Sequence, residues 1–541
     1  MFRSTLFLLL SVFTFTQGSP TFFTIPLPIE NEAFLHNRLE EISDLRHPSY
    51  GQWMSMEDVN AIAQPTTIPL PLLSWMKSWE FAGLTCSLEG YSLTCSTKTY
   101  ANEILANLPE GFVFQGSHAT LPAFKSPDRQ VTNTPNYFVF PQTIWNLYGV
   151  PPEAHSPVSL APVEFQNDST YLNTDMAAFE KYTGLHITLP TPGHIVGPFS
   201  NNSADVEASL DMDYVAGVAP NVTLWYWTAE GWVLSAVEKM LNASALPQVM
   251  TWSYGWSEND QCAIVHCSNT TSHDFVRLAN QRLMLLALRG TTVVVASGDA
   301  GSPGRTNENC DNSEFPLNAV FPGASPYVLS VGATTLVNVT TLDSSSPTYP
   351  PFCSTGPNPQ NYTCVGNGTQ VMCSNGNGGC FWTAGGGFSN VSVTPSYQRQ
   401  EVYDYLMDHN VSKPWGLFNG SGRGYPDLAA VGHSFFVIAN GGIMPVDGTS
   451  ASTPTVGALI ARLNAERVAR GQPVLGYVNP AFYLAAREAP GAFVSIDHGS
   501  NNCTETGCCP YGYNAREGGW DPVTGNGYPN YPVLRDFLIG R

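Results

Sequence analysis

From Gln142 onward, short apolar strands alternate with amphipathic helices. This alternation is typical of a parallel β-sheet covered by helices on both faces, because two parallel strands need a long crossover and a helix supplies it. The predicted strands are residues 221–228, 248–253, 291–296 and 434–439, and the predicted helices are residues 204–215, 232–242, 274–288 and 450–470. We therefore predict an α/β fold for this part of the chain.

The first part of the chain has a different pattern and indicates a separate α+β unit. It carries three predicted helices and then short alternating strands through Cys95; the helices cover residues 34–45, 56–63 and 72–82. A stretch rich in Pro and Thr, residues 125–135, follows as an exposed linker would. At 541 residues the chain is long enough for two or more folding units, so we predict that residues 19–130 fold apart from residues 131–541.

One region interrupts the alternation of strands and helices. Residues 340–382 contain four cysteines and many Gly, Asn and Pro residues. We predict a disulfide-held surface insert there.

The N-terminus predicts entry into the secretory pathway. Residues 1–18 combine Arg3 with an apolar run from Leu6 to Phe15, the pattern of a signal peptide cleaved near Gly18. That run is too short to span a bilayer, and no later apolar stretch is long enough, so we expect the mature protein to be soluble, in the lysosome or secreted. Sequons for N-glycosylation support this route; they begin at Asn167, Asn201, Asn221, Asn242, Asn269, Asn338, Asn361, Asn367, Asn390, Asn410, Asn419 and Asn502.

The twelve cysteines form an even set, as expected of disulfides in an oxidising compartment. The pairs closest in sequence, Cys86–Cys95 and Cys262–Cys267, are the simplest predicted disulfides. A zinc site is disfavoured because no CxxC pair occurs, although His266 stands beside Cys267.

The charge balance excludes some partners and favours an acidic setting. With 23 Lys and Arg against 43 Asp and Glu, the net charge is −20, which removes the electrostatic basis for binding nucleic acid or an anionic membrane. Such a surface loses negative charge at about pH 4–5 as its carboxylates protonate.

The segment from Val446 to Pro454 is a turn of small residues that opens an amphipathic helix. Ser450 in this turn lies at the positive end of the helix, where backbone N–H groups favour a developing negative charge. A serine nucleophile also needs a base within hydrogen-bonding reach. None of the eleven histidines stands in the His-Gly-Thr context that a subtilisin uses before its serine.

Carboxyl groups are the alternative source of that base. Glu207 and Asp211 are four residues apart and share one face of a predicted helix. Two carboxylates at this spacing repel each other when both are ionised and tend to share a proton at mildly acid pH. Taken alone, such a pair is usually a solvated helix face.

Asp299 follows the apolar strand 293–296, as the last residue of Ser297-Gly298-Asp299. Functional residues gather at the carboxyl ends of parallel strands. A protonated Asp in that place can donate a hydrogen bond to an oxyanion, whereas an ionised one opposes it. Taken alone, the segment is a turn after a strand.

Three strings together resemble the motifs of the sedolisin family of serine-carboxyl peptidases, in order and in spacing. They are residues 207–211, 297–299 and 448–454; further strings, residues 252–255, 385–390, 421–427 and 519–525, are similar to the tripeptidyl-peptidase members of that family. The resemblance covers nearly the whole chain and implies a subtilisin-like parallel sheet flanked by helices. It also implies that residues 19–130 are a prodomain that inhibits the enzyme until cleavage near residues 125–140.

The resemblance implies a role for each residue of the motifs. Ser450 would be the nucleophile and Glu207 the general base and acid. Asp211 would orient Glu207, and Asp299 would donate to the oxyanion. A carboxyl group with a pKa near 4 suits acid–base catalysis at about pH 4–5, so activity is expected in acid.

The family also carries a calcium site near the C-terminus. The matching ligands here would be the carboxylates of Asp497 and Asp521 and the carbonyl oxygens of His498, Glu517 and Gly519, all hard oxygen ligands of the kind that calcium prefers. The sequence departs from the family at Glu517 and Gly518, but ligation through backbone carbonyls tolerates a change of side chain.

Three alternatives remain open from the sequence. A subtilisin-like peptidase with a histidine base is disfavoured, because this sequence lacks the His-Gly-Thr motif. An inactive glycoprotein binding module is disfavoured, because all four catalytic side chains are present. Within the family, release of tripeptides from free N-termini is the first hypothesis and endopeptidase action is the second. The expected partners are peptide or protein substrates and the chain's own prodomain.

Overall fold

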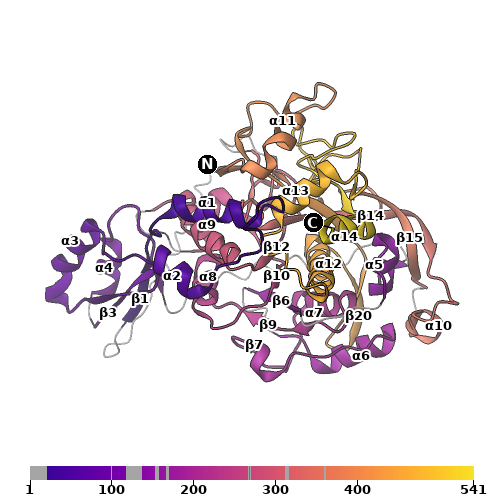
Figure 1. Ribbon diagram of the computed structural model, residues 1–541, viewed down its shortest axis with the longest axis horizontal. Coiled ribbons are helices and arrows are strands. Elements are labelled where there is room, and N and C mark those ends of the chain that lie inside the picture. The colour runs from indigo at the N-terminus through magenta and orange to yellow at the C-terminus, as the bar shows by residue number, and fades with distance from the viewer. Residues whose placement is uncertain are drawn as a thin grey trace, which may run out of the picture.

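The computed structural model of the protein describes most of the chain (Figure 1). The described residues are 21–98, 100–116, 137–152, 158–165, 170–265, 267, 270–310, 316–358 and 361–540. The predicted signal peptide, the boundary at residues 130 and 131, most of the predicted cleavage region and the sequons at Asn167 and Asn269 lie outside these residues.

Within the described residues, a ten-stranded sheet forms the centre of the larger part of the protein. The strand order is β5-β15-β14-β12-β10-β6-β9-β7, with β18 paired to β14 and β8 paired to β6. Neighbouring strands are parallel except β14 and β15. The strands are β5 (Tyr137–Phe138), β6 (Ser159–Glu164), β7 (Ile195–Val196), β8 (Thr223–Leu224), β9 (Tyr226–Thr228), β10 (Val249–Trp252), β12 (Thr292–Ala296), β14 (Leu329–Thr341), β15 (Thr363–Met372) and β18 (Leu428–Val431).

Helices cover both faces of this sheet, as the alternating sequence predicts. Successive residues of β12 show the two faces: Val294 belongs to the core that contains α7 and α12, whereas Val293 and Val295 belong to the core that contains α8 and α9. The helices are α5 (Pro141–Tyr148), α6 (Asn173–Thr183), α7 (Val206–Val218), α8 (Val233–Asn242), α9 (Ser272–Leu288), α10 (Phe352–Thr355), α11 (Arg399–Met407), α12 (Thr449–Ala469), α13 (Asn479–Glu488) and α14 (Tyr531–Ile539). The predicted α/β fold is confirmed.

A glycine allows α12 to lie directly on the sheet. A Cβ atom added at Gly457 would lie 2.2 Å from Cγ2 of Thr251 on β10, which is closer than two carbon atoms can approach. The absence of a side chain therefore sets the distance between the helix that carries Ser450 and the centre of the sheet.

The strand predicted over residues 434–439 is present, but it forms one arm of a hairpin outside the central sheet. β19 (Phe435–Ala439) pairs antiparallel with β20 (Gly442–Val446). Asn440 and Gly441 join them with φ values of 51° and 74°, the left-handed backbone that a two-residue hairpin turn needs. The remaining strands are β11 (Trp256–Ser257), β13 (Val320–Phe321), β16 (Gly387–Val393), β17 (Gly422–Tyr425), β21 (Phe493–Val494) and β22 (Tyr528–Pro529).

The N-terminal unit is an α+β domain with its own core, at the indigo end of Figure 1. Its antiparallel sheet has the order β2-β3-β1-β4. The elements are β1 (Thr21–Pro26), α1 (Glu32–Ser43), α2 (Met56–Ala63), α3 (Leu70–Trp79), β2 (Thr85–Glu89), β3 (Ser92–Thr97), α4 (Ala101–Ala106) and β4 (Gln115–Gly116). The three predicted helices are present, and β1, which the sequence analysis did not predict, is a central strand.

A buried arginine of α9 joins the N-terminal unit to the rest of the protein. Arg282 Nη2 donates hydrogen bonds to the carbonyl oxygens of Leu27 (2.6 Å) and Tyr91 (3.0 Å), and Arg282 Nε donates to Glu238 on α8 (3.1 Å). Because the Arg282 side chain is completely buried, these bonds are shielded from water and hold the two units together.

All twelve cysteines lie in the described residues and form six disulfides, among them the predicted pairs Cys86–Cys95 and Cys262–Cys267. The other four are Cys310–Cys509, Cys353–Cys364, Cys373–Cys380 and Cys503–Cys508, and the second and third of these lie in the region 340–382. That region is not only a surface insert, because it supplies β15 to the central sheet. No helix in the described ranges is long and apolar enough to cross a membrane.

Candidate active site

Ser450 lies in the first turn of α12, at the carboxyl ends of the central strands. Gly448 precedes the helix with φ 139°, a conformation that favours glycine. Ser450 is buried with 7% of its surface exposed. The N–H groups of the first turn point out of the helix start and create a positive end beside the hydroxyl.

The spacing between Ser450 and Pro454 leaves the Ser450 carbonyl oxygen without a helical partner. In an α-helix this oxygen would accept a bond from the N–H four residues later, but Pro454 has no N–H. The hydroxyl of Ser253, the residue after β10, lies 3.3 Å from the Ser450 carbonyl oxygen and takes the position of the missing N–H donor. In return, Ser450 Oγ donates to the Ser253 carbonyl oxygen at 3.3 Å.

Ser253 also connects Ser450 to Asp211. The Ser253 Oγ atom lies 2.9 Å from both carboxyl oxygens of Asp211, which is completely buried on α7. The structure therefore brings the predicted serine and one predicted carboxyl group to the same side chain. Sequence reasoning did not single out Ser253 for a role of its own, because its position depends on β10 and α12 lying side by side.

Asp211 belongs to a group of three carboxyl side chains. Burial, with the nearby carboxyl groups of Glu164 and Glu207, raises the pKa of Asp211 well above its usual range, while the Ser253 hydrogen bond opposes the rise. Glu207 lies in the first turn of α7, where the helix favours negative charge, and its Oε1 atom is buried. The predicted pair is therefore close enough to interact electrostatically, and this environment favours the protonated form of Asp211.

Glu164 is the carboxyl group that the sequence analysis missed. It ends β6, is completely buried, and accepts a hydrogen bond from the Tyr254 hydroxyl at 2.8 Å. A charged residue at the carboxyl end of an apolar strand was the available signal, the same signal that identified Asp299.

Asp299 is fixed beside the same turn of α12. Its Oδ1 atom accepts two hydrogen bonds from Thr449, one from the backbone N–H and one from the hydroxyl, each 2.8 Å long. The Gly298 N–H donates to the Thr449 hydroxyl at 3.1 Å, so the strand end and the helix start are locked together. Since Oδ1 already accepts two bonds, Oδ2 is the oxygen of Asp299 that faces away from Thr449.

A hollow that is open to solvent lies beside Asp299. Trp256 and Val320 supply apolar walls, and Gly298 and Arg305 line it as well. Arg305 Nη2 lies 3.6 Å from Asp299 Oδ2. The hollow adjoins the start of α12, because Asp299, which lines it, accepts from the N–H of Thr449, the residue before Ser450.

Two of the predicted calcium ligands, Asp497 and Asp521, contact a turn near the C-terminus. Asp521, completely buried, accepts hydrogen bonds from the backbone N–H groups of Arg516 (3.1 Å), Val523 (3.0 Å) and Thr524 (2.8 Å), and burial raises its pKa to about 7. Asp497 is exposed and accepts from the Gly518 N–H at 3.4 Å.

Both carboxylates therefore accept hydrogen bonds from backbone N–H groups of the turn 516–521. Among the described residues, no hydrogen bond reaches the carbonyl oxygens of His498, Glu517 or Gly519, so all three are available as ligands. The set of two carboxylates and three carbonyls fits a calcium ion in its chemistry. Within the described residues no group of three or more His, Cys, Asp or Glu side chains could hold a metal, so a metal here would depend on backbone carbonyls.

Comparison with known proteins identifies the family. The family model of the subtilase family matches residues 192–473, and that of the pro-kumamolisin activation domain matches residues 14–89. Physarolisin from Physarum polycephalum is 35% identical over 94% of this chain and 92% of its own. The chain belongs to the sedolisin family. It is a serine-carboxyl peptidase with an N-terminal prodomain.

Other sedolisin relatives agree with this assignment. Tripeptidyl-peptidase 1 from Mus musculus is 28% identical over 95% of this chain and 91% of its own. A solved structure of Pseudomonas sedolisin, complexed with two molecules of pseudo-iodotyrostatin, matches 75% of this chain and 99% of its own with a TM-score of 0.53 at 21% identity. The last comparison supports the subtilisin-like fold.

Proposed function

We propose that this sedolisin is an acid-active exopeptidase that releases tripeptides from the free N-termini of peptides and proteins. Ser450 acts as the nucleophile, Glu207 as the general base and acid, Asp211 as the group that orients Glu207, and Asp299 as the oxyanion donor. The observation that carries these roles is the Ser253 hydroxyl, which lies within hydrogen-bonding distance of both Asp211 and the Ser450 backbone.

The chemistry follows from carboxyl groups in place of an imidazole. Glu207 takes the hydroxyl proton as Ser450 Oγ attacks the peptide carbonyl carbon, and then returns it to the leaving amine. Water repeats both steps on the acyl-enzyme. A proton on Asp299 Oδ2 donates to the oxyanion, which requires acid conditions.

Tripeptide release is supported by the likeness to tripeptidyl-peptidase 1, which extends over nearly the whole chain. A paired digestion separates it from endopeptidase action. The acid-activated enzyme is incubated at about pH 4 with one peptide bearing a free N-terminus and the same peptide acetylated, and the products are weighed. Three-residue fragments only from the free peptide support the proposal, and internal cuts in both peptides contradict it.

The prodomain is proposed to inhibit the enzyme until acid triggers its removal. Its contacts with α9 through Arg282 provide a buried attachment that does not depend on the linker. We expect cleavage near residues 125–140 when purified precursor is brought from about pH 7 to about pH 4. Equal activity at both pH values without cleavage would contradict this inhibition.

Calcium is proposed to bind the turn 516–521. Asp497 and Asp521 would hold it with their carboxylates, and His498, Glu517 and Gly519 with their carbonyl oxygens. The ion would add stability and would take no part in peptide cleavage. A chelator is expected to lower the melting temperature of the Ser450→Ala protein, and an unchanged melting temperature with no retained calcium would contradict the site.

The lysosome or the extracellular space is the proposed location. Of the ten sequon asparagines in the described residues, eight are exposed and available to glycans, and Asn390 and Asn502 are half-buried. Loss of apparent mass after enzymatic removal of N-glycans would support passage through the secretory pathway, and a protein without glycans would count against it.

A further inference from the structure

Arg305 places a positive charge at the hollow beside Asp299. Its Nη2 atom lies 3.2 Å from Glu505 Oε1 and 3.6 Å from Asp299 Oδ2. The Arg305 side chain is 30% exposed, so a molecule in the hollow can reach it. Neither the general base nor the nucleophile requires a guanidinium, so the catalytic roles proposed above leave Arg305 unexplained.

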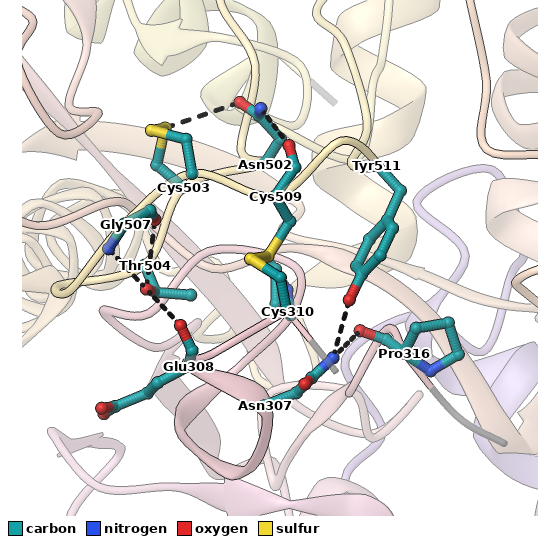
Figure 2. Close-up of a disulfide and its surroundings, with 12 residues drawn as sticks. Asn307, Glu308, Cys310, Pro316, Asn502, Cys503, Thr504, Gly507, Cys509 and Tyr511 are labelled. Carbon is teal, nitrogen blue, oxygen red and sulfur yellow. Dashed lines mark hydrogen bonds between the residues drawn. A yellow bond between two sulfur atoms is a disulfide. The ribbon is translucent and has the colours of Figure 1, made fainter. Parts of the chain in front are cut away.

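The segment that carries Arg305 is fixed by the disulfide Cys310–Cys509 and by hydrogen bonds between residues 302–308 and residues 501–511, which we call the clamp (Figure 2). Arg305 begins a short 3₁₀ helix that ends at Asn307. The Asn307 side-chain amide donates to the Tyr511 hydroxyl at 3.0 Å, and the disulfide closes the same junction three residues later. A guanidinium held by such a frame loses less conformational freedom when it binds a ligand.

Other bonds of the clamp attach the neighbouring backbone. The hydroxyls of Thr504 (3.3 Å) and Thr506 (2.9 Å) donate to the Glu308 carbonyl oxygen, and the Ser302 N–H donates to the Asn501 carbonyl oxygen (2.8 Å). A segment about two hundred residues further along the sequence thus holds the 3₁₀ helix whose first residues line the hollow.

Arg305 keeps donors available for a ligand. Its side-chain hydrogen bonds and ion pairs to the described residues all run through Nη2, so Nε and Nη1 make none there. A guanidinium carries five N–H donors in a planar fork that matches the two oxygens of a carboxylate. The apolar walls of Trp256 and Val320 suit the methylene groups that precede such a carboxylate.

The carboxyl groups around Arg305 compete with a ligand for its charge. Those that act on it are Asp299, Glu505 and Glu308. Burial raises the pKa of Glu505 above its ordinary value, so Glu505 takes up a proton at a higher pH than an exposed carboxyl group would. In mild acid, therefore, Glu505 competes for Arg305 less strongly than an exposed carboxylate would.

We propose that Arg305 is a specificity-determining residue that selects substrates with an acidic side chain next to the bond that is cleaved. This inference rests on the proposed function, because it requires the hollow beside Asp299 to hold a substrate side chain while Ser450 attacks. It adds a substrate class to that function: peptides with Glu or Asp in the residue seated in the hollow.

Three matched peptides test this preference. The three peptides are identical except for the residue beside the cleaved bond, which is Glu in one, Gln in the second and Leu in the third. For each peptide, kcat/KM is measured at about pH 5 with acid-activated wild type, Arg305→Gln and Arg305→Lys. The Arg277→Gln protein is the control, because Arg277 is an exposed arginine with its own carboxylate partner and does not line the hollow.

The readout is the ratio of the Glu peptide to the Gln peptide within each protein. We expect a Glu-to-Gln ratio of about five in the wild type and in Arg277→Gln, and of about one in Arg305→Gln. The ratio in Arg305→Lys should lie between these two values. A substitution of Arg305 could also shift Asp299 and slow the cleavage of every peptide; the Leu peptide measures that general loss, and the ratio does not depend on it. If the Arg305→Gln protein does not mature, the Arg305→Lys protein provides the test.

A wild-type ratio near one, or the same ratio in wild type and Arg305→Gln, would overturn the role of Arg305 and leave the proposed peptidase standing. Cleavage of none of the three peptides by activated wild type would overturn both the proposed function and this inference.

Discussion

Replacement of Glu258 by Gln tests whether buried carboxyl groups make this protein more stable in acid. Glu258 is completely buried, and its carboxyl oxygens accept hydrogen bonds from the Ser389 hydroxyl (2.6 Å) and the Asn390 N–H (2.7 Å). Burial outweighs these bonds and raises the pKa of Glu258 from 4.5 to about 7. At 1.36 kcal/mol per pKa unit, this rise corresponds to about 3 kcal/mol.

The sign follows from proton counting. Below about pH 4.5 both the folded and the unfolded chains hold the proton, so Glu258 adds no pH dependence there. Between about pH 4.5 and about pH 7 the folded chain keeps the proton and the unfolded chain releases it, so the free energy of unfolding falls as pH rises. Above about pH 7 the full loss of about 3 kcal/mol is present.

The assay is urea unfolding, followed by tryptophan fluorescence, from about pH 4.5 to about pH 7.5. Both proteins carry Ser450→Ala, which prevents self-processing in acid under the proposed mechanism. We expect the loss of stability across this range to be about 3 kcal/mol smaller in Glu258→Gln, whatever the absolute cost of the substitution. Glu57→Gln, at an exposed position on α2, is the control and should keep the wild-type slope. Equal slopes in wild type and Glu258→Gln would refute the reasoning.

Three further substitutions probe the frame of the site. Gly457→Ala should destabilise the protein by about 1–3 kcal/mol, because a Cβ there meets Thr251 on β10; a higher melting temperature would contradict this. Replacing Cys310 and Cys509 together by Ser should cost about 2–4 kcal/mol, since that disulfide closes a loop of 199 residues; calorimetry that shows no change would count against the clamp. Ser253→Ala should lower kcat/KM about tenfold and move its pH profile upward, because the lost hydrogen bond no longer lowers the carboxyl pKa; an unchanged profile would exclude that role.

The parts of the fold that local sequence patterns determine were predictable. The helix predicted over residues 450–470 is α12, Thr449–Ala469, and the strand predicted over residues 291–296 is β12, Thr292–Ala296. Each is long or apolar enough for its periodicity to decide its type. The hairpin around Asn440 was missed, although Asn-Gly between apolar runs is a strong turn signal, because the preceding strands favoured another parallel strand.

Contacts between distant segments could not be predicted in the same way. Ser253 reaches Asp211 and Ser450 only because β10 lies beside β12 beneath the start of α12, and sequence spacing carries no record of that neighbourhood. Arg305 is six residues from Asp299, but its place at the hollow depends on a disulfide to Cys509. The motifs therefore identified which side chains matter, and the tertiary fold supplied their partners.

The pH dependence of kcat/KM in activated wild type and in Glu207→Gln tests the central claim most directly, which is that a carboxyl group activates Ser450. We predict that wild-type activity is highest at about pH 4–5 and falls toward neutrality, and that Glu207→Gln loses about 10²–10⁴-fold across the profile. A wild-type maximum above neutrality, with Glu207→Gln fully active, would contradict the account and point to a histidine base.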